Sequence, residues 1–439
     1  MQTYDSCKNS GIDWLGEIPS HWEVKKITYL FTKIGSGTTP TAGSVLYYEN
    51  GTINFLQTGD LNDGFINQTS KKITQKALED NTSLKLFPKG SLVIAMYGAT
   101  IGKLGILNID TTTNQACCVL GGGVKDLDTK FIFYWFSFAK RDIISMSYGG
   151  GQPNISQDLI KSLRIHYPPI SEQEAIAAFL DEKCGKIDEL VSVKEKQIAL
   201  LKERRQVVIH EAVTKGIQPN VELKDSGIDW IGEIPKHWEV GPLKYLTTKI
   251  VDGAHFTPTY VDEGIPFLRV TDISKSGIDR KIDWNSVKFI PIQEHKELIK
   301  RANPEKGDIL LSKNGTIGLT RVIDWNEEFS FFVSLCLIKP TKRLSPFYFE
   351  FFFNCPLVDR QINDSSSRTS VTNLHLEKIK ELLIVLPPIS EQETIVAYLE
   401  EQTGKIDQAI ALKTEQIEKL KAYKQSLINE VVTGKVKVA

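Results

Sequence analysis

The sequence repeats itself once, and this duplication constrains the fold more than any other feature. Residues 10–24 read Ser-Gly-Ile-Asp-Trp-Leu-Gly-Glu-Ile-Pro-Ser-His-Trp-Glu-Val, and nearly the same segment returns at residues 226–240. The seven residues Pro-Pro-Ile-Ser-Glu-Gln-Glu occur at 168–174 and again at 387–393. This period is far longer than the unit of a solenoid, so we predict two copies of one pair of domains.

Between these repeated segments the copies diverge, but a common skeleton remains. Residues 53–60 resemble residues 265–272, and residues 90–102 resemble residues 307–318. Such a pattern is expected of two modules that share one fold and bind different ligands. The variable parts are short β-branched and aromatic runs broken by Gly, Asn, Asp and Pro, with a few helices, which indicates α/β (α+β) domains. The predicted domain boundaries are 1–167 and 220–386 for the variable domains, and 168–219 and 387–439 for helical spacers.

Local patterns predict several elements. Residues 92–95 and 309–311 are apolar runs that we expect to be buried strands, while residues 131–138 and 347–353 are expected to be apolar helices packed against the sheet. Each spacer is predicted to begin with a capping box, to be interrupted by one glycine and to end at another. These residues are Ser171, Glu174, Gly185 and Gly216 in the first copy and Ser390, Glu393, Gly404 and Gly434 in the second.

Both spacers carry an apolar seam with 3-4 spacing, which is typical of helices that pair as a coiled coil. The seam residues are Ile187, Val191, Lys194, Ile198, Leu201, Arg205 and Val208, and then Ile406, Ile410, Lys413, Ile417, Leu420, Lys424 and Leu427. Even the basic interruptions coincide. The alternative is that each helix packs on its own domain, but that arrangement needs a separate apolar groove in each copy.

Composition narrows the class of protein. The 53 Lys and Arg residues nearly balance the 54 Asp and Glu residues, for a net charge of −1, which excludes a simple polycationic nucleic-acid binder but not a locally basic one. No apolar run reaches the roughly 18 residues of a membrane span, and the N-terminus lacks the apolar segment of a signal peptide. The six cysteines are scattered, with neither metal spacing nor a disulfide framework. We therefore expect a cytoplasmic protein with reduced thiols and no membrane partner.

The duplicated segments carry a resemblance to a known family. The twice-occurring Gly-Ile-Asp-Trp-(Leu/Ile)-Gly-Glu-Ile-Pro-x-His-Trp-Glu-Val segment and the twice-occurring Pro-Pro-Ile-Ser-Glu-Gln-Glu segment resemble those of the specificity (S) subunit of type I restriction–modification enzymes. Their order, a variable module followed by a repeated helix, matches that family's architecture over the whole chain.

This resemblance implies a function and a set of partners. In the family, two target-recognition domains each read one half of a bipartite target in double-stranded DNA. The helices form an antiparallel pair that sets the spacing and docks methyltransferase (M) subunits, here expected to be two, and restriction (R) subunits join that core. The resemblance implies that the chemistry resides in those other subunits, so the chain itself is expected to be non-catalytic.

The sequence lacks the motifs of the enzymes that such a chain could otherwise be. The Pro-Pro pairs follow Tyr167 and Leu386, so the Asn-Pro-Pro-aromatic motif of adenine methyltransferases is absent, and no nucleotide-binding loop occurs. Asp13, Glu23 and Lys25 resemble a nuclease pattern, but the second copy has Gly241 in place of the lysine. We predict no cofactor and, because the histidines lack ligand spacing, no metal. The four tryptophans of the repeated segments, Trp14, Trp22, Trp230 and Trp238, are interpreted as packing anchors.

Candidate DNA contacts are polar side chains on expected loops, where they can reach base edges. The alternative for each one is an ordinary polar turn. Two other functions stay open: an enzyme with a fused methyltransferase or nuclease activity, and a stand-alone bipartite DNA-binding or decoy protein without M subunits. The candidates are Thr38, Thr39, Tyr97, Thr100, Lys103, Gln152 and Asn154 in the first copy, and His255, Thr257, Arg269, Lys313, Asn314, Thr316, Arg321, Arg368 and Asn373 in the second.

Overall fold

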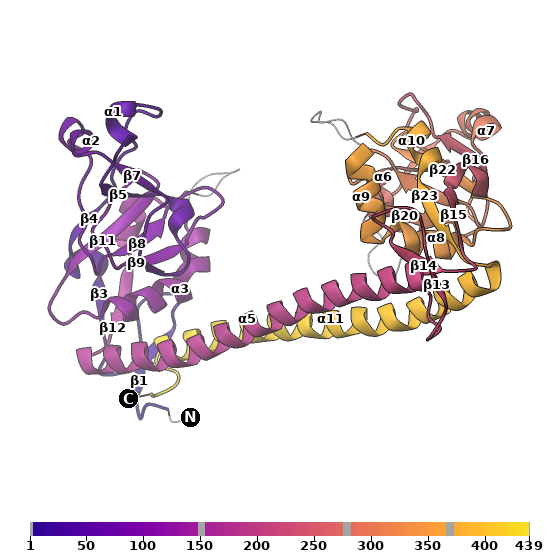
Figure 1. Ribbon diagram of the computed structural model, residues 1–439. Coiled ribbons are helices and arrows are strands. Elements are labelled where there is room, and N and C mark those ends of the chain that lie inside the picture. The colour runs from indigo at the N-terminus through magenta and orange to yellow at the C-terminus, as the bar shows by residue number, and fades with distance from the viewer. Residues whose placement is uncertain (1–2, 148–153, 275–281, 366–372, 439) are drawn as a thin grey trace. The chain divides into compact units, whose positions relative to one another are not determined.

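The computed structural model describes residues 3–147, 154–274, 282–365 and 373–438. The chain forms two compact units that do not follow the order of the sequence (Figure 1). Unit 1 consists of Met1–Val193 and Gln416–Ala439, and unit 2 consists of Lys194–Glu415. Each unit therefore contains one variable domain together with one half of each of the two long helices.

Unit 1 is built around a five-stranded sheet of order β4-β11-β8-β9-β6, with a smaller sheet of order β10-β5-β7. Two-stranded ladders join β1 to β2 and β3 to β12. The elements are β1 (Cys7–Asn9), β2 (Glu17–Pro19), β3 (Glu23–Lys26), η1 (Ile27–Tyr29), β4 (Phe31–Gly35), α1 (Val45–Tyr48), β5 (Ile53–Leu56), η2 (Thr58–Asp60), β6 (Gly64–Ile66), β7 (Lys71–Ile73), α2 (Gln75–Asp80), β8 (Leu92–Ala95), β9 (Leu104–Leu107), β10 (Thr112–Thr113), β11 (Cys117–Gly123), α3 (Thr129–Ser145), α4 (Gln157–Ser162), β12 (Arg164–Tyr167) and the first part of α5 (Ile170–Lys215).

Unit 2 repeats this plan with a four-stranded sheet of order β16-β22-β19-β20 and a smaller sheet of order β18-β17-β21. Its two-stranded ladders join β13 to β14 and β15 to β23. The elements are β13 (Leu223–Asp225), β14 (Glu233–Pro235), β15 (Glu239–Pro242), η3 (Leu243–Leu246), β16 (Thr247–Asp252), β17 (Ile265–Leu268), α6 (Val270–Ser274), β18 (Lys288–Ile290), α7 (Ile292–Arg301), β19 (Ile309–Ser312), β20 (Thr320–Val322), β21 (Ser330–Phe331), β22 (Leu335–Pro340), α8 (Pro346–Phe353), α9 (Pro356–Ser365), α10 (Leu376–Glu381), β23 (Leu383–Leu386) and the first part of α11 (Ile389–Val432).

The central sheet of each unit is buried on both faces, which explains its continuous apolar strands. In β8, Leu92 and Ile94 point to the core that includes α3, while Val93 and Ala95 point to a second cluster on the opposite face. Strand β19 divides its side chains in the same way. The predicted strands at 92–95 and 309–311 are confirmed, and so are the apolar helices, which are α3 and α8.

The long helices pair antiparallel through the predicted seam. In unit 2, Lys413 Nζ donates to Gln197 Oε1 at 2.7 Å, and Arg205 Nε lies 3.1 Å from Asp407 Oδ1. Residue numbers therefore rise along α5 while those of the contacting residues fall along α11. In unit 1, Lys424 Nζ lies 2.7 Å from Asp188 Oδ1. Two of the four basic interruptions, Arg205 and Lys424, therefore form cross-helix ion pairs with the aspartates of the repeated Gly-Lys-Ile-Asp segments. The alternative in which each helix packs alone is wrong.

Two predicted details of these helices are wrong. Gly185 and Gly404 do not interrupt them, because α5 and α11 continue unbroken through both positions. Helix α5 also begins at Ile170, before Ser171, and the amides of Glu172 and Gln173 donate to the Pro169 carbonyl instead of to a capping hydroxyl. The predicted ends are confirmed, since Gly216 and Gly434 follow the helices with positive φ values of 78° and 73°.

In each copy, the two repeated segments contact one another through their side chains. The carboxylate of Glu172 accepts from Trp22 Nε1 at 3.0 Å and lies 2.6 Å from His21 Nε2. Glu391 repeats both contacts with Trp238 and His237, at 2.9 and 2.7 Å. These two Glu-His-Trp clusters tie the start of each long helix to the segment that leads into the variable domain. Trp22 and Trp238 are thus packing anchors, as predicted.

The neighbouring glutamine of the same motif binds the variable domain. Gln173 is fully buried, and its side chain donates to the Pro168 carbonyl and accepts from the amide of Asp128, the N-cap of α3. Gln392 makes the equivalent contacts with Pro387 and with Ser345, the N-cap of α8. Repetition of Glu and Gln in both copies therefore follows from two fixed sets of contacts.

Among the described residues, no helix is long and apolar enough to cross a membrane.

Candidate nucleic-acid interface

The sheet of unit 1 brings the predicted loops of the first copy to one edge. Gly35 pairs with Val119 and Ala95 pairs with Cys117, so β4 and β8 both end where β11 begins. The loop with Thr38 and Thr39 follows β4, and the loop with Tyr97 and Thr100 follows β8. The segment after residue 153 joins them, because the amide of Ile155 donates to the Met96 carbonyl at 2.8 Å.

Unit 2 assembles its loops in the same way. Asp252 pairs with Cys336 and Ser312 pairs with Leu335, so β16 and β19 end at one edge. The amide of Leu374 donates to the Lys313 carbonyl at 3.0 Å, which repeats the contact between Ile155 and Met96. His255, Asn314 and Asn373 thus belong to loops that occupy the same places as those of the first copy.

A glycine at the start of the first loop is required in both copies. A Cβ atom at Gly37 would collide with the carbonyl oxygen of Thr113, and one at Gly253 would collide with that of Phe331. These close approaches fix where each loop leaves the sheet. The Gly37 amide also donates to Thr113 Oγ1 at 3.0 Å. The loops therefore depart from a rigid, matching frame, and their own residues differ.

The two copies differ in a buried polar position beneath these loops. In unit 2, Lys313 is 5% exposed, and its ammonium lies 2.5 Å from the carboxylate of Asp252. His255 Nε2 lies 3.4 Å from the other oxygen of Asp252. In unit 1 the matching residues are Met96 and Ser36, with no charge. Lys313 therefore holds the loop through its buried ion pair with Asp252, and its ammonium is not exposed at the loop surface.

The predicted contact residues are placed as follows. Thr39, Asn154, His255, Thr257, Thr316 and Asn373 are exposed, and Thr38, Tyr97, Thr100, Lys103, Arg269 and Asn314 are half-buried. Arg269 is held by two bonds to Asp272, at 3.0 and 2.9 Å. Lys313 and Arg321 are buried, and Arg321 lies within β20 instead of at the loop edge. Gln152 and Arg368 lie outside the described residues.

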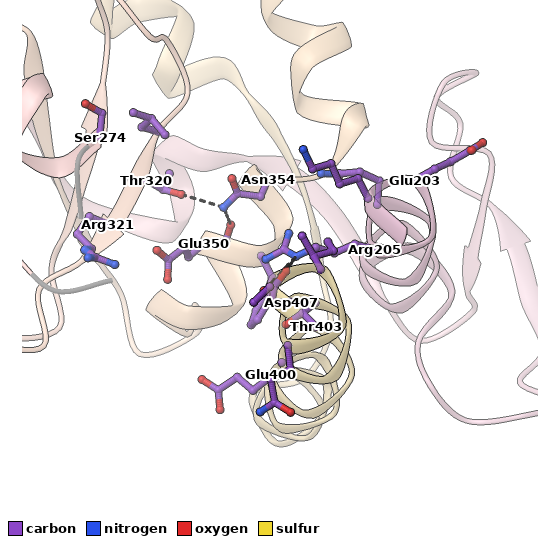
Figure 2. Close-up of a pocket in the computed structure, with 18 of the residues that line it drawn as sticks. Glu203, Arg205, Ser274, Thr320, Arg321, Glu350, Asn354, Glu400, Thr403 and Asp407 are labelled. Carbon is purple, nitrogen blue, oxygen red and sulfur yellow. Dashed lines mark hydrogen bonds and ion pairs between the residues drawn. The ribbon is translucent and has the colours of Figure 1, made fainter. Parts of the chain in front are cut away.

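A groove of about 1230 Å³ lies within unit 2, between α8, β20 and the two long helices (Figure 2). Its walls include Arg321, Glu350 and Asn354, and Arg205 with Asp407 forms the side made by the long helices. Asn354 Nδ2 donates to Thr320 Oγ1 at 3.4 Å and to the Glu350 carbonyl at 2.7 Å. In unit 1 the matching helix surfaces are joined directly, because Lys130 and Tyr134 of α3 both bind Asp181.

The carboxyl group of Glu172 in the first repeated segment has a perturbed pKa. Burial opposes ionisation of Glu172, but hydrogen bonds from Trp22, His21 and Tyr4 outweigh it and hold the pKa of this carboxyl below its ordinary value. Among the described residues, no group of three or more His, Cys, Asp and Glu side chains is arranged to hold a metal ion. The contacts of His21 with Glu172 and of His237 with Glu391 were not predicted from the sequence, although all four residues lie in repeated segments.

Comparison with protein families gives one match that covers most of the chain. Residues 19–202 and 235–422 each match the family model described as the type I restriction modification DNA specificity domain. The two matches fall on the two copies that the sequence repeat defines.

Curated proteins and solved structures agree with this match. The chain is 25% identical over 434 residues to the type I restriction enzyme MjaVIII specificity subunit of Methanocaldococcus jannaschii, covering 96% of this chain and 94% of that protein. It is 23% identical over 438 residues to the EcoKI specificity subunit of Escherichia coli, covering 96% and 90%. A chain from a solved type I R-M system is similar with a TM-score of 0.71 at 17% identity, covering 95% of this chain and 99% of that one.

Proposed function

This chain belongs to the type I restriction modification DNA specificity domain family, and from that premise we propose that it reads a bipartite DNA target for a type I restriction–modification complex. Residues 1–167 and 220–386 act as target-recognition domains, each for one half of the target. Residues 168–219 and 387–439 act as spacers that fix the gap between the half-sites. The proposed role places the protein in the cytoplasm.

The observation that carries this proposal is the pair of matching loop frames. Both units present two loops at the same sheet edge, and equivalent backbone contacts at Met96 and Lys313 attach the segment that begins at Asn154 or Asn373, while the loop residues differ. Side-chain donors and acceptors on loops read base edges, and a fixed frame positions them. In unit 1 we propose contacts from Thr38, Thr39, Tyr97, Thr100, Lys103, Gln152 and Asn154. In unit 2 we propose contacts from His255, Thr257, Arg269, Asn314, Thr316, Arg368 and Asn373, with Lys313 and Arg321 supporting the domain from within.

The paired helices offer a surface for protein partners. Large apolar side chains remain exposed on the paired helices, and such groups mark interaction surfaces when they cluster. They are Leu190, Val193 and Tyr423 in unit 1, and Leu200, Val207 and Leu412 in unit 2. We propose that two methyltransferase subunits dock here and that restriction subunits join the resulting core.

The proposed chain is non-catalytic, with double-stranded DNA and the other subunits as its partners. Three experimental outcomes distinguish this role from the two alternatives, a fused enzyme and a stand-alone DNA-binding or decoy protein. Binding of S-adenosylmethionine by the purified chain alone would favour a fused enzyme. Failure to co-purify with a methyltransferase subunit would favour a stand-alone DNA-binding or decoy protein. Co-purification without cofactor binding by the isolated chain supports the proposed role.

Exchange of one variable domain tests the reading function directly. We replace residues 25–167 with the equivalent segment of another family member and sequence the methylated sites of cells that express the hybrid. Because the loop frame lies wholly within unit 1, one half-site is expected to change while the other half-site and the gap stay the same. A change in both half-sites would contradict separate reading by the two domains.

A further inference from the structure

One exposed aromatic side chain occurs at the same position in both copies. Tyr29 is 75% exposed and Tyr245 is 71% exposed, at matching positions in η1 and η3. Each begins the segment Tyr-Leu-x-Thr-Lys-Ile, at residues 29–34 and 245–250. A single exposed aromatic residue is ordinary, but the same one at the same place in two divergent domains requires a reason.

Packing explains most of this segment but not its tyrosine. Leu30 and Leu246 are buried in the cores of their units. Thr32 Oγ1 donates to the Gly122 carbonyl at 2.9 Å, and Thr248 Oγ1 donates to the Lys339 carbonyl at 3.3 Å, so both hydroxyls bind the adjacent strand. Neither exposed tyrosine belongs to the core of its unit, although Lys244 Nζ lies 5.2 Å from the centroid of the Tyr245 ring. Something outside the chain must therefore favour it in both copies.

The tyrosines lie at the sheet edge opposite the proposed DNA-reading loops. Phe31, two residues after Tyr29, pairs with Gly123, whereas the loop after β4 starts where Gly35 pairs with Val119. In unit 2, Thr247 pairs with Pro340 at the tyrosine edge and Asp252 pairs with Cys336 at the loop edge. The five residues of β4 alone span about 16 Å. A duplex held by the loops is therefore a poor candidate for the ligand of these tyrosines.

One four-residue strand connects the same edge to a long helix in each unit. The Ile27 amide donates to the Leu163 carbonyl at 3.0 Å, and β12 then leads directly into α5. In unit 2, the Leu243 amide donates to the Leu382 carbonyl at 2.8 Å, and β23 leads into α11. Each exposed tyrosine thus follows one end of a two-stranded ladder, β3 with β12 or β15 with β23, whose other end leads into the helix on which a partner is proposed to dock.

Charged groups around the tyrosines are also repeated. Short helices α4 and α10 pack against η1 and η3, and each carries an acidic residue followed three positions later by a lysine. Asp158 and Lys161 lie 3.7 Å apart, and Glu377 and Lys380 lie 2.8 Å apart. A ligand that meets both units therefore meets the same aromatic ring in a domain with the same acid–lysine pair. Unit 2 has in addition an ion pair between Lys244 and Glu381, at 2.7 Å, where unit 1 has the uncharged Thr28 and Ser162.

We propose that Tyr29 and Tyr245 are the centres of two equivalent docking surfaces on the variable domains, each for one methyltransferase subunit. This inference rests on the proposed function and extends the docking surface beyond the helices. The partner needs an apolar pocket for the ring, an acceptor for the phenol and polar groups that complement the flanking acid and lysine. Exposed tyrosines that enter such pockets commonly dominate the binding energy of an interface.

The test measures binding of the methyltransferase subunit from the same restriction–modification system to the full chain. Tyr29→Ala, Tyr245→Ala and the double variant are compared by native mass spectrometry and titration. Each single substitution is expected to weaken binding of one of the two subunits at least tenfold, and the double substitution to weaken both. Because both side chains are exposed, the melting temperature of the free chain is expected to stay the same.

Leu46→Ala and Ile292→Ala are the matched controls. These residues are 67% and 57% exposed, and neither is repeated in the other copy. For example, the position of Ile292 at the start of α7 is occupied by Gln75 at the start of α2. Binding of methyltransferase to these variants should equal wild type. Unchanged binding by the double tyrosine variant would overturn this inference alone, as would a loss confined to DNA affinity. A wild-type chain that binds no methyltransferase subunit would overturn the proposed function as well.

Discussion

At the scale of single residues, the two copies show which positions carry structure. His166 is completely buried in unit 1, stacks on Trp22 at 5.4 Å between ring centroids, and accepts a hydrogen bond from Trp135 Nε1 at 3.2 Å. Burial lowers the pKa of this imidazole to about 3. The second copy has Val385 and Phe352 at the matching places, so the matching part of its core contains no imidazole.

His166 should make unit 1 sensitive to mild acid. Its pKa is about 3 when folded and about 6.5 when unfolded, so the unfolded chain binds more protons between these values. Stability from this residue is therefore complete above pH 6.5 and is lost as pH falls, by up to about 1.4 kcal/mol per pH unit. Between pH 6.5 and 5, the urea midpoint for exposure of the β8 amides to hydrogen exchange is expected to fall.

A variant built from the second copy provides the control. His166→Val with Trp135→Phe reproduces the pair found in unit 2 and removes both the imidazole and the indole that donates to it. This variant should show no such dependence in β8, and the β19 amides of unit 2 report background effects of pH. An equal slope in wild type and variant would assign the acid sensitivity to another group.

At the scale of elements, hydrophobic periodicity was a sound guide. Strands β8 and β19 and the seam of α5 and α11 were predictable because burial of apolar side chains decides them locally. The interruptions at Gly185 and Gly404 were predicted wrongly. A glycine costs a helix roughly 1 kcal/mol relative to alanine, and the seam on either side, with its ion pairs at Asp188 and Asp407, offsets that cost.

Contacts between residues far apart in the sequence could not be predicted. Lys313 was a candidate DNA contact because it lies on an expected polar loop. The partner that buries it, Asp252, belongs to a different strand, and nothing in either local segment indicates the pair. The bond between Trp22 and Glu172 escaped for the same reason. Its one signal was that both residues lie in segments that occur twice.

The Glu-His-Trp cluster should be worth a measurable part of the stability of unit 1. Glu172→Ala leaves the Nε1 donor of the fully buried Trp22 without its acceptor, so a loss of about 1–3 kcal/mol is expected. Glu172→Gln keeps an acceptor oxygen and should lose less. Urea denaturation of the full chain measures both losses, and Glu174→Ala, in the same turn, is the control. Equal losses for the alanine and glutamine variants would exclude the hydrogen bond as the cause.

At the scale of the whole molecule, the two units share both long helices. Because α5 and α11 each contribute one half to each unit, neither copy completes its own core. Leu427 and Val431 of α11 belong to the core of unit 1, and Ile209 and Val213 of α5 belong to that of unit 2. The helices are therefore part of both domains and at the same time the proposed spacer between them. A change in their length should alter the spacing without altering the loops.

Matched insertions in both helices test the spacer role. Four residues inserted after Ala199 and four after Ala411 add about 6 Å of helix and turn it by about 400°, so the seam stays nearly in phase. With a rise of about 3.4 Å per base pair, the gap in the methylated sequence should lengthen by about one or two base pairs while both half-sites stay the same. Two residues at each position turn the seam by about 200° and would expose Leu201, so that variant should be unstable. Sequencing of methylated sites reads the gap after each insertion. A stable four-residue variant with an unchanged gap would show that the helices do not set the spacing.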